Sequence, residues 1–257
     1  MHAKNFAKPG GAGTANLSYH NGPVINTAKV VFIFWNGTNG DGFSTFSGYT
    51  STLQSFRNQF GTTTHYGIIG QYYDSTGNIN GSPNLAAGTL DWNDVTNDLP
   101  ADGNVTDALV QAEVSRYLAF NAFDNSTVYE VVIPASLQGG APVYSSSGSS
   151  DSCGGPVLQY CAYHSHYTSG SNTVKYSIEP YPSCSGCQAS GFNDVQNQEH
   201  FVTHETREAV TDELGSAWYD RRGYEADDKC AWTPAPFLDG GYGYQDEWSN
   251  AASGCVP

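Results

Sequence analysis

Residues Gln198–Asp212 read QEHFVTHETREAVTD, and their polar side chains recur at the spacing of an α-helix. Four of these side chains are spaced by four residues: His200, His204, Glu208 and Asp212. Residues four apart lie on neighbouring turns of one helix face, so the four side chains form a drifting polar stripe. Glu205 lies one step around the helix from this stripe. The sequence therefore predicts a helix with imidazole and carboxylate groups on one side.

Such a helix face can hold a divalent cation. Its core, H-E-x-x-E, resembles the H-E-x-x-H of zinc peptidases with the second imidazole replaced by a carboxylate. His204 and Glu208 would bind the cation from one side of the helix. Glu205 would then lie beside the cation and take a proton from a water molecule that the cation polarises. The alternative interpretation is a surface helix with an ordinary histidine–glutamate pair.

A third ligand has several candidates. A catalytic tetrahedral zinc site needs three protein ligands and one open position. The candidates for the third ligand are Glu225, Asp228 and His200. Glu225 and Asp228 follow the helix in the segment GYEADDKC, residues 223–230. The alternative for that segment is a solvated acidic turn before a cysteine.

Two further side chains are candidates for substrate contact. Tyr219 could stabilise a developing oxyanion, and the alternative is an aromatic residue of the core. His164 and His166 alternate on one face of an expected strand. If that strand runs along the cleft, His164 lies near the substrate or the metal. Otherwise both histidines are exposed strand residues.

The apolar pattern predicts a single α/β (α+β) domain, in which helices pack on a mixed sheet and one helix is zincin-like. The expected strands are Ala28–Trp35, His65–Tyr73, Thr127–Pro134, Val157–Tyr167 and Val174–Tyr181, and the expected further helices are Tyr49–Phe60 and Asp107–Phe120. We expect residues 1–18 to be a flexible arm. We expect residues 19–257 to form the catalytic domain, with a disulfide-rich C-terminal half.

The composition indicates a secreted protein that does not bind nucleic acid or membrane. The net charge of the 257-residue chain is −15, whereas phosphate binding requires lysine and arginine. No apolar run is long enough to span a bilayer. The first residues do not read as a signal peptide, so we expect that a targeting segment was removed. We expect a monomer.

The six cysteines indicate disulfide bonds. Proximity in the sequence favours the pairs Cys153–Cys161, Cys184–Cys187 and Cys230–Cys255. The alternatives are a cysteine-ligated zinc site or a redox-active C-x-x-C at residues 184–187. That motif lies in a loop rich in proline, serine and glycine rather than at a helix start, which favours a disulfide.

Several motifs together resemble the secreted Exordium/phosphate-induced protein family and its microbial relatives. That family pairs a HExxE helix with a downstream E-I-x-D-x-C element, which matches HETREAVTD and then Glu225, Asp228 and Cys230 here. Further matches are WYD after the helix, Gly22-Pro23-Val24, the C-x-x-H of Cys161–His164, the loop PSCSGC and the closing EWSN…C of Glu247–Cys255. The resemblance runs from about residue 19 to the end. One departure is Thr211-Asp212-Glu213, where the microbial relatives read T-D-P.

These observations predict a secreted zinc-dependent hydrolase, a metallopeptidase acting on a protein or peptide substrate. The expected cofactor is Zn²⁺, with Ca²⁺ as an alternative or additional ion. The resemblance implies a cell-wall setting but supplies no reaction. The alternative is a non-catalytic extracellular protein that binds a cell-wall polymer or other carbohydrate and carries a structural metal site. An enzyme leaves one metal position open to a cleft, whereas a structural site is closed.

Overall fold

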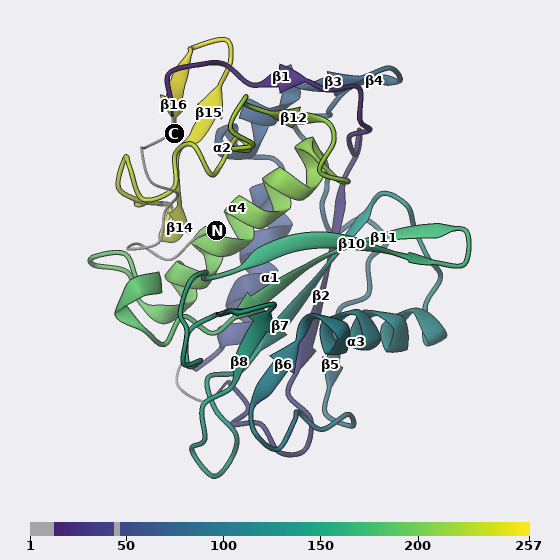
Figure 1. Ribbon diagram of the computed structural model, residues 1–257, viewed down its shortest axis with the longest axis vertical. Helices are drawn as coiled ribbons and strands as arrows, with labels where there is room; N and C mark the ends of the chain where they lie inside the picture. Colours follow the sequence, from purple (N-terminus) through teal and green to yellow (C-terminus); the bar gives the residue numbers. More distant parts are fainter. Residues whose placement is uncertain (1–12, 44–46) are drawn as a thin grey trace.

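The central strand of the fold is β7, in a computed structural model that describes residues 13–43 and 47–257. Within those residues it belongs to a five-stranded sheet of order β10-β11-β7-β2-β5 (Figure 1). The strands are β2 (Lys29–Trp35), β5 (Trp92–Asp94), β7 (Thr127–Ile133), β10 (Tyr163–Ser169) and β11 (Asn172–Pro180). All neighbours in this sheet are parallel except β10, which is an antiparallel edge strand on β11. The expected mixed sheet is confirmed.

Helices cover both faces of this central sheet (Figure 1). They are α1 (Tyr49–Phe60), α3 (Asp107–Phe120) and α4 (Asp194–Thr211). Helices α1 and α4 share an apolar core with Val30, Phe32 and Phe34 of β2. Helix α3 shares a second core with Val31, Ile33 and Trp35 on the opposite face. Because both faces are covered, β2 reads as a nearly continuous apolar run in the sequence, and β7 as an apolar run interrupted by Glu130.

Helix α4 is the most enclosed of the described helices. All of its residues except Asp194 and Gln196 are buried. The helix begins with a capping box, in which the Asn193 side chain accepts from the N–H of Gln196 and the Gln196 side chain accepts from the N–H of Asn193. This box satisfies two backbone donors that a helix start leaves open. The polar side chains of α4 are therefore interior groups and not a solvated face.

Most predicted elements are confirmed. Helices α1 and α3 have the predicted bounds, and β2, β7 and β11 lie within one or two residues of theirs. The predicted helix at residues 198–212 begins four residues earlier, at Asp194, and ends at Thr211. The turn between β10 and β11 contains Gly170 at a φ of 62°, which glycine adopts without steric cost.

The predicted strand His65–Tyr73 is wrong. This segment forms the short helices α2 (Thr64–Gly67) and η1 (Ile68–Gln71), followed by β3 (Tyr73–Asp74). The Thr63 hydroxyl caps α2 by accepting from the N–H of Tyr66. Tyr66, Ile69 and Tyr72 then recur every three residues and are all buried, which is a helical and not an alternating pattern.

Short elements complete the described part of the chain. They are β1 (Ser18–Tyr19), β4 (Gly77–Asn78), β6 (Asn104–Thr106), β8 (Tyr144–Ser147), β9 (Ser150–Asp151), η2 (Ser185–Cys187), β12 (Trp218–Tyr219), β13 (Phe237–Asp239), β14 (Tyr242–Tyr244), β15 (Glu247–Ser249) and β16 (Gly254–Val256). Residues 1–12 of the predicted arm lie outside the described residues. The remainder of the arm is attached, since Leu17 is buried and its N–H donates to the Asn250 side chain at 2.8 Å.

All six cysteines lie in the described part of the chain and form disulfides. The predicted pair Cys230–Cys255 is confirmed. The other two predicted pairs are wrong, because the bonds are Cys153–Cys184 and Cys161–Cys187. Both bonds join the segment before β10 to the loop before α4, which lie side by side although they are distant in sequence. Three disulfides are compatible with an oxidising, extracellular environment.

Among the described helices, none combines the length and the apolar character needed to cross a membrane.

Candidate metal centre

Helix α4 brings His204 and Glu208 together one turn apart. The Nε2 atom of His204 lies 3.1 Å from Oε2 of Glu208, and both side chains are buried. Asp228, from the loop after β12, donates its N–H to Oε1 of Glu208 at 2.8 Å. Its Oδ1 lies 3.7 Å from His204 Nε2. These three side chains form a group whose ligand atoms all lie within 4.8 Å of one another.

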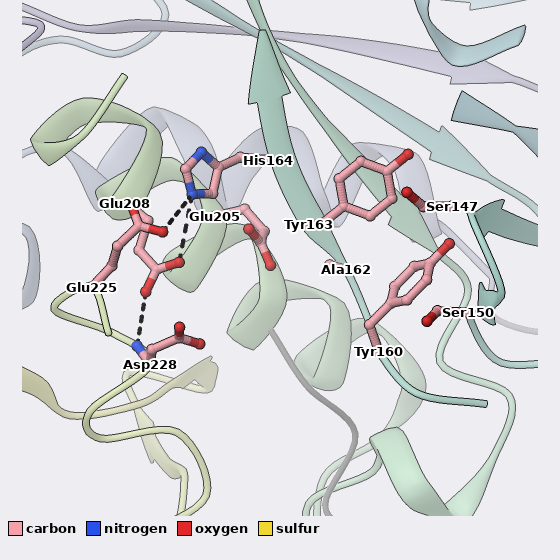
Figure 2. A pocket seen from close by; sticks show the side chains of 10 residues that line it. All are labelled: Ser147, Ser150, Tyr160, Ala162, Tyr163, His164, Glu205, Glu208, Glu225 and Asp228. Atoms are coloured by element: carbon pink, nitrogen blue, oxygen red, sulfur yellow. Dashed lines mark hydrogen bonds and ion pairs between the residues drawn. The ribbon is translucent and has the colours of Figure 1, made fainter. Parts of the chain in front are cut away.

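His164 approaches the same carboxylate from the edge of the sheet. It lies opposite Ser177 in the β10–β11 ladder, with its side chain extending toward α4. Its Nε2 is 3.6 Å from Glu208 Oε2 and 3.3 Å from Glu225 Oε2 (Figure 2). His164, Glu205 and Glu208 form a second group within 4.8 Å, which shares Glu208 with the first group. His164 is therefore part of the centre itself.

Gln245 contacts the far side of His204. Its Oε1 lies 3.1 Å from His204 Nδ1, and its amide nitrogen donates to the Asp227 carboxylate at 2.8 Å. This orientation of the amide makes Oε1 an acceptor, so His204 donates from Nδ1, and Nε2 is the nitrogen that carries the lone pair when the ring is neutral. That Nε2 is buried and has no hydrogen-bond partner among the described residues. An imidazole nitrogen presented in this way to two carboxylates fits a metal ligand.

The structure does not bring His200 into this group. Its Nε2 lies 2.9 Å from Gln245 Oε1, and its ring packs edge-on against Trp232 at 4.9 Å between centroids. Burial lowers the pKa of His200 to about 3, so the ring is neutral at physiological pH. His200 continues the stripe of α4 but faces Gln245 rather than the carboxylates. We therefore do not retain it as a metal ligand.

Tyr219 is also separated from the centre. It lies in β12, where it pairs with Ser18 of β1, and its ring stacks on His20 at 3.7 Å between centroids. Among the described residues, the set that lines the cavity described below does not include Tyr219. We therefore do not retain an oxyanion role for this residue.

The carboxylates set the protonation of the centre. Burial acts to lower the pKa of His204, but Glu208 and Glu205 outweigh it and raise this pKa to about 9. Burial likewise opposes the effect of Glu225 and Glu208 on His164, whose pKa is raised well above its ordinary value. Burial and the neighbouring Glu208 raise the pKa of Glu225 to about 8, against the opposing effect of His164. Without a cation, protons therefore offset the negative charge that a divalent ion would neutralise.

A cavity of about 320 Å³ opens beside these groups. Figure 2 shows Glu205 between the histidine–carboxylate cluster on one side and two tyrosines on the other. The second wall consists of Ser147, Ser150, Tyr160, Ala162 and Tyr163. The Tyr163 hydroxyl donates to Asp107 at 2.8 Å, and the Tyr160 hydroxyl shares a hydrogen bond with Ser145 at 2.9 Å. The cavity therefore has one anionic wall and one neutral, aromatic wall.

The sequence did not identify Gln245 or this aromatic wall. Gln245 lies in a short loop segment with no motif of its own. Tyr160 and Tyr163 are two of the many tyrosines of the chain, and their position depends on the disulfides at Cys153 and Cys161.

No protein-family model matches the chain, and neither a curated protein nor a solved structure is detectably similar to it. The resemblance to the Exordium/phosphate-induced proteins therefore remains a prediction that rests on the sequence motifs.

Proposed function

We propose that the protein is a secreted metallopeptidase with Zn²⁺ bound by His204, Glu208 and Asp228. The observation that carries this proposal is the convergence of these three side chains within 4.8 Å beside a cavity that Glu205 also lines. One imidazole nitrogen among carboxylate oxygens suits Zn²⁺ better than Ca²⁺, which prefers a shell of oxygen ligands. Bound Zn²⁺ would supply a Lewis acid that polarises a carbonyl and makes water acidic at neutral pH.

Glu205 is the proposed general base. It takes a proton from the attacking water, the water oxygen bonds to the scissile carbonyl carbon, and the C–N bond breaks. Glu205 then returns the proton to the leaving nitrogen, so that the products are a carboxylate and an amine. Gln245 keeps His204 in the tautomer that this arrangement requires. The tyrosine wall favours an uncharged or aromatic substrate side chain, because its lining residues are uncharged and two of them are aromatic.

The first test is metal analysis of the purified protein together with digestion of an unstructured protein substrate. The substitution Glu205→Gln should leave the metal content unchanged and reduce cleavage by about 10²- to 10⁴-fold, as expected for loss of a general base. His204→Ala should lose both metal and cleavage. Glu113→Gln makes the same substitution in α3, on the opposite face of the sheet and outside this cavity, and serves as the control.

Two results would contradict the proposal. Metal retention by His204→Ala would remove the ligand assignment. A metal-loaded protein that cleaves no protein substrate, and that behaves the same with Glu205→Gln, would favour the non-catalytic alternative. In that case the paired rings of Tyr160 and Tyr163, 5.2 Å apart, are the candidate surface for stacking on a sugar ring.

A further inference from the structure

Glu208 lies between two imidazoles that belong to different elements. The same oxygen, Oε2, is 3.1 Å from Nε2 of His204 and 3.6 Å from Nε2 of His164. The other oxygen, Oε1, accepts the backbone N–H of Asp228. A carboxylate oxygen that faces one imidazole on each side is placed to bridge two cations.

Each side of this oxygen also has its own terminal carboxylate. On the His204 side Asp228 lies 3.7 Å from the imidazole, and on the His164 side Glu225 lies 3.3 Å from it. The Oε1 atom of Glu225 is buried and has no hydrogen-bond partner among the described residues. Buried carboxylate oxygens normally have a partner, so this atom lacks one that a cation would supply.

The charge of the cavity points in the same direction. Four carboxylates line it, those of Glu205, Glu208, Glu225 and Asp228, and among the described lining residues there is no lysine or arginine. When all four are ionised, their formal charge is −4. One divalent cation leaves −2, whereas two bring the formal charge to zero. A low-dielectric site with this excess of negative charge is costly unless it is neutralised.

We propose that the centre binds a second divalent transition-metal ion through His164, Glu225 and the bridging Glu208. This inference rests on the proposed function, because the first ion occupies the His204 side. Each ion then has one imidazole, one terminal carboxylate and a share of Glu208. Zn²⁺, Co²⁺ or Mn²⁺ suits this mixed nitrogen and oxygen set. Paired ions of this kind bind both the attacking and the leaving group of a hydrolysis.

The test is the number of metal ions per chain. Purified protein is loaded with Zn²⁺, passed over a desalting column and measured by elemental mass spectrometry. We expect about two equivalents for the unaltered protein and about one for His164→Ala. His166→Ala is the matched control and should keep both, because His166 is an exposed histidine two residues further along the same strand. Glu225→Gln should lower the affinity of the protein for the second ion without changing its affinity for the first.

The outcomes separate this inference from the proposed function. One equivalent in the unaltered protein, with metal-dependent cleavage, would overturn the second site and leave the peptidase proposal standing. No bound metal would overturn both. If His164→Ala fails to fold, the number of metal ions bound by the unaltered protein still decides whether the second site exists. Titration of the unaltered protein with Co²⁺ measures that number independently. Two successive changes in the visible spectrum support the paired site, and a single change contradicts it.

Discussion

Gln245 lies behind the candidate metal centre and contacts both histidines of α4. Its side-chain oxygen is 2.9 Å from His200 Nε2 and 3.1 Å from His204 Nδ1. Its amide nitrogen is bound by the backbone and the carboxylate of Asp227, which is itself paired with the buried Arg207. This chain of contacts fixes the amide and, through it, the ring of His204.

The substitution Gln245→Leu tests this positioning role. It removes the acceptor for His204 Nδ1, so the ring can rotate or change tautomer. We expect metal affinity to fall by about 10- to 100-fold, the usual effect of losing a partner that orients a ligand. Competition with a chromogenic chelator measures this affinity.

The control for that experiment is Gln59→Leu, which removes a different interior hydrogen bond, to the Tyr244 hydroxyl. Its metal affinity should match that of the unaltered protein. If Gln245→Leu and Gln59→Leu have the same metal affinity, Gln245 does not orient His204 and only stabilises the fold.

For individual residues, the sequence predicts contacts within one helix but not contacts between different elements. The pair His204 and Glu208 follows from their spacing, because residues four apart on a helix are neighbours in any fold. The same rule placed His200 in the stripe, but it cannot tell which part of a fully buried helix faces which neighbour. The distance from His164 to Glu208 depends on how the edge strand lies against α4, which local spacing does not contain.

Helix α4 depends on its first turn. The capping box of Asn193 and Gln196 lies eight or more residues before His204, the first retained candidate ligand of the helix. Substitution Asn193→Ala removes an acceptor for the N–H of Gln196, and we expect the free energy of unfolding to fall by about 1 kcal/mol. Denaturant titration measures this change.

Helix α3 supplies the comparison. Thr106 occupies the equivalent position of α3, but its side chain makes no capping hydrogen bond. We therefore expect Thr106→Ala to have a smaller effect than Asn193→Ala. Equal losses from both variants would mean that the box contributes nothing beyond an ordinary helix start.

Among the elements, the long ones were predictable and the short ones were not. Strands β2 and β7 are buried on both faces, so their apolar runs identify them. Strand β5 spans only Trp92–Asp94 in a turn-rich stretch and gives no periodic signal. The segment at residues 65–73 carries residues typical of strands, but its buried positions and the cap at Thr63 favour helical turns.

At the scale of the whole molecule, several buried glutamates lie outside the candidate metal centre. Burial raises the pKa of Glu113, Glu130 and Glu199 to about 8 in each case. Asp94 adds to the effect at Glu113, while Asn97 and Arg116 oppose it. At Glu130 the hydrogen bond from Thr206 and the charge of Arg57 oppose the effect of burial.

These raised pKa values predict a fold that is more stable in acid than in base. A carboxyl that titrates near 8 in the folded chain, against an ordinary value of 4.5, contributes its full stabilisation below pH 4.5. That contribution is lost as the pH rises toward 8, because the unfolded chain ionises more easily. For chelated protein we expect the Tm at pH 5 to be higher than the Tm at pH 8.5, because the carboxyls of Glu113, Glu130 and Glu199 have lost most of this contribution at pH 8.5.

Calorimetry across this pH range is the measurement. The variant Glu113→Gln is neutral at every pH and should flatten the curve in part. A Tm that rises from pH 5 to pH 8.5 would contradict the assignment of these glutamates as protonated groups of the folded protein.

The disulfide pattern also belongs to this scale. Proximity in sequence found only Cys230–Cys255, because the other two bonds join segments that the fold, and not the chain, brings together. Cys153 and Cys161 lie in one of these segments and Cys184 and Cys187 lie in the other, and the sequence does not indicate which cysteine bonds to which.

Helix α4 is buried almost throughout, so its candidate ligands are in place before any cation binds. A helix whose backbone is covered almost throughout cannot fray residue by residue, so its amide protons exchange with solvent only when the surrounding domain opens. We therefore expect the backbone amides of His204, Glu205 and Glu208 to exchange slowly, at the rate of the cooperative opening of the domain. A cation that binds at the proposed site would therefore meet ligands already positioned by folding, and its binding would not need to order the helix that holds them.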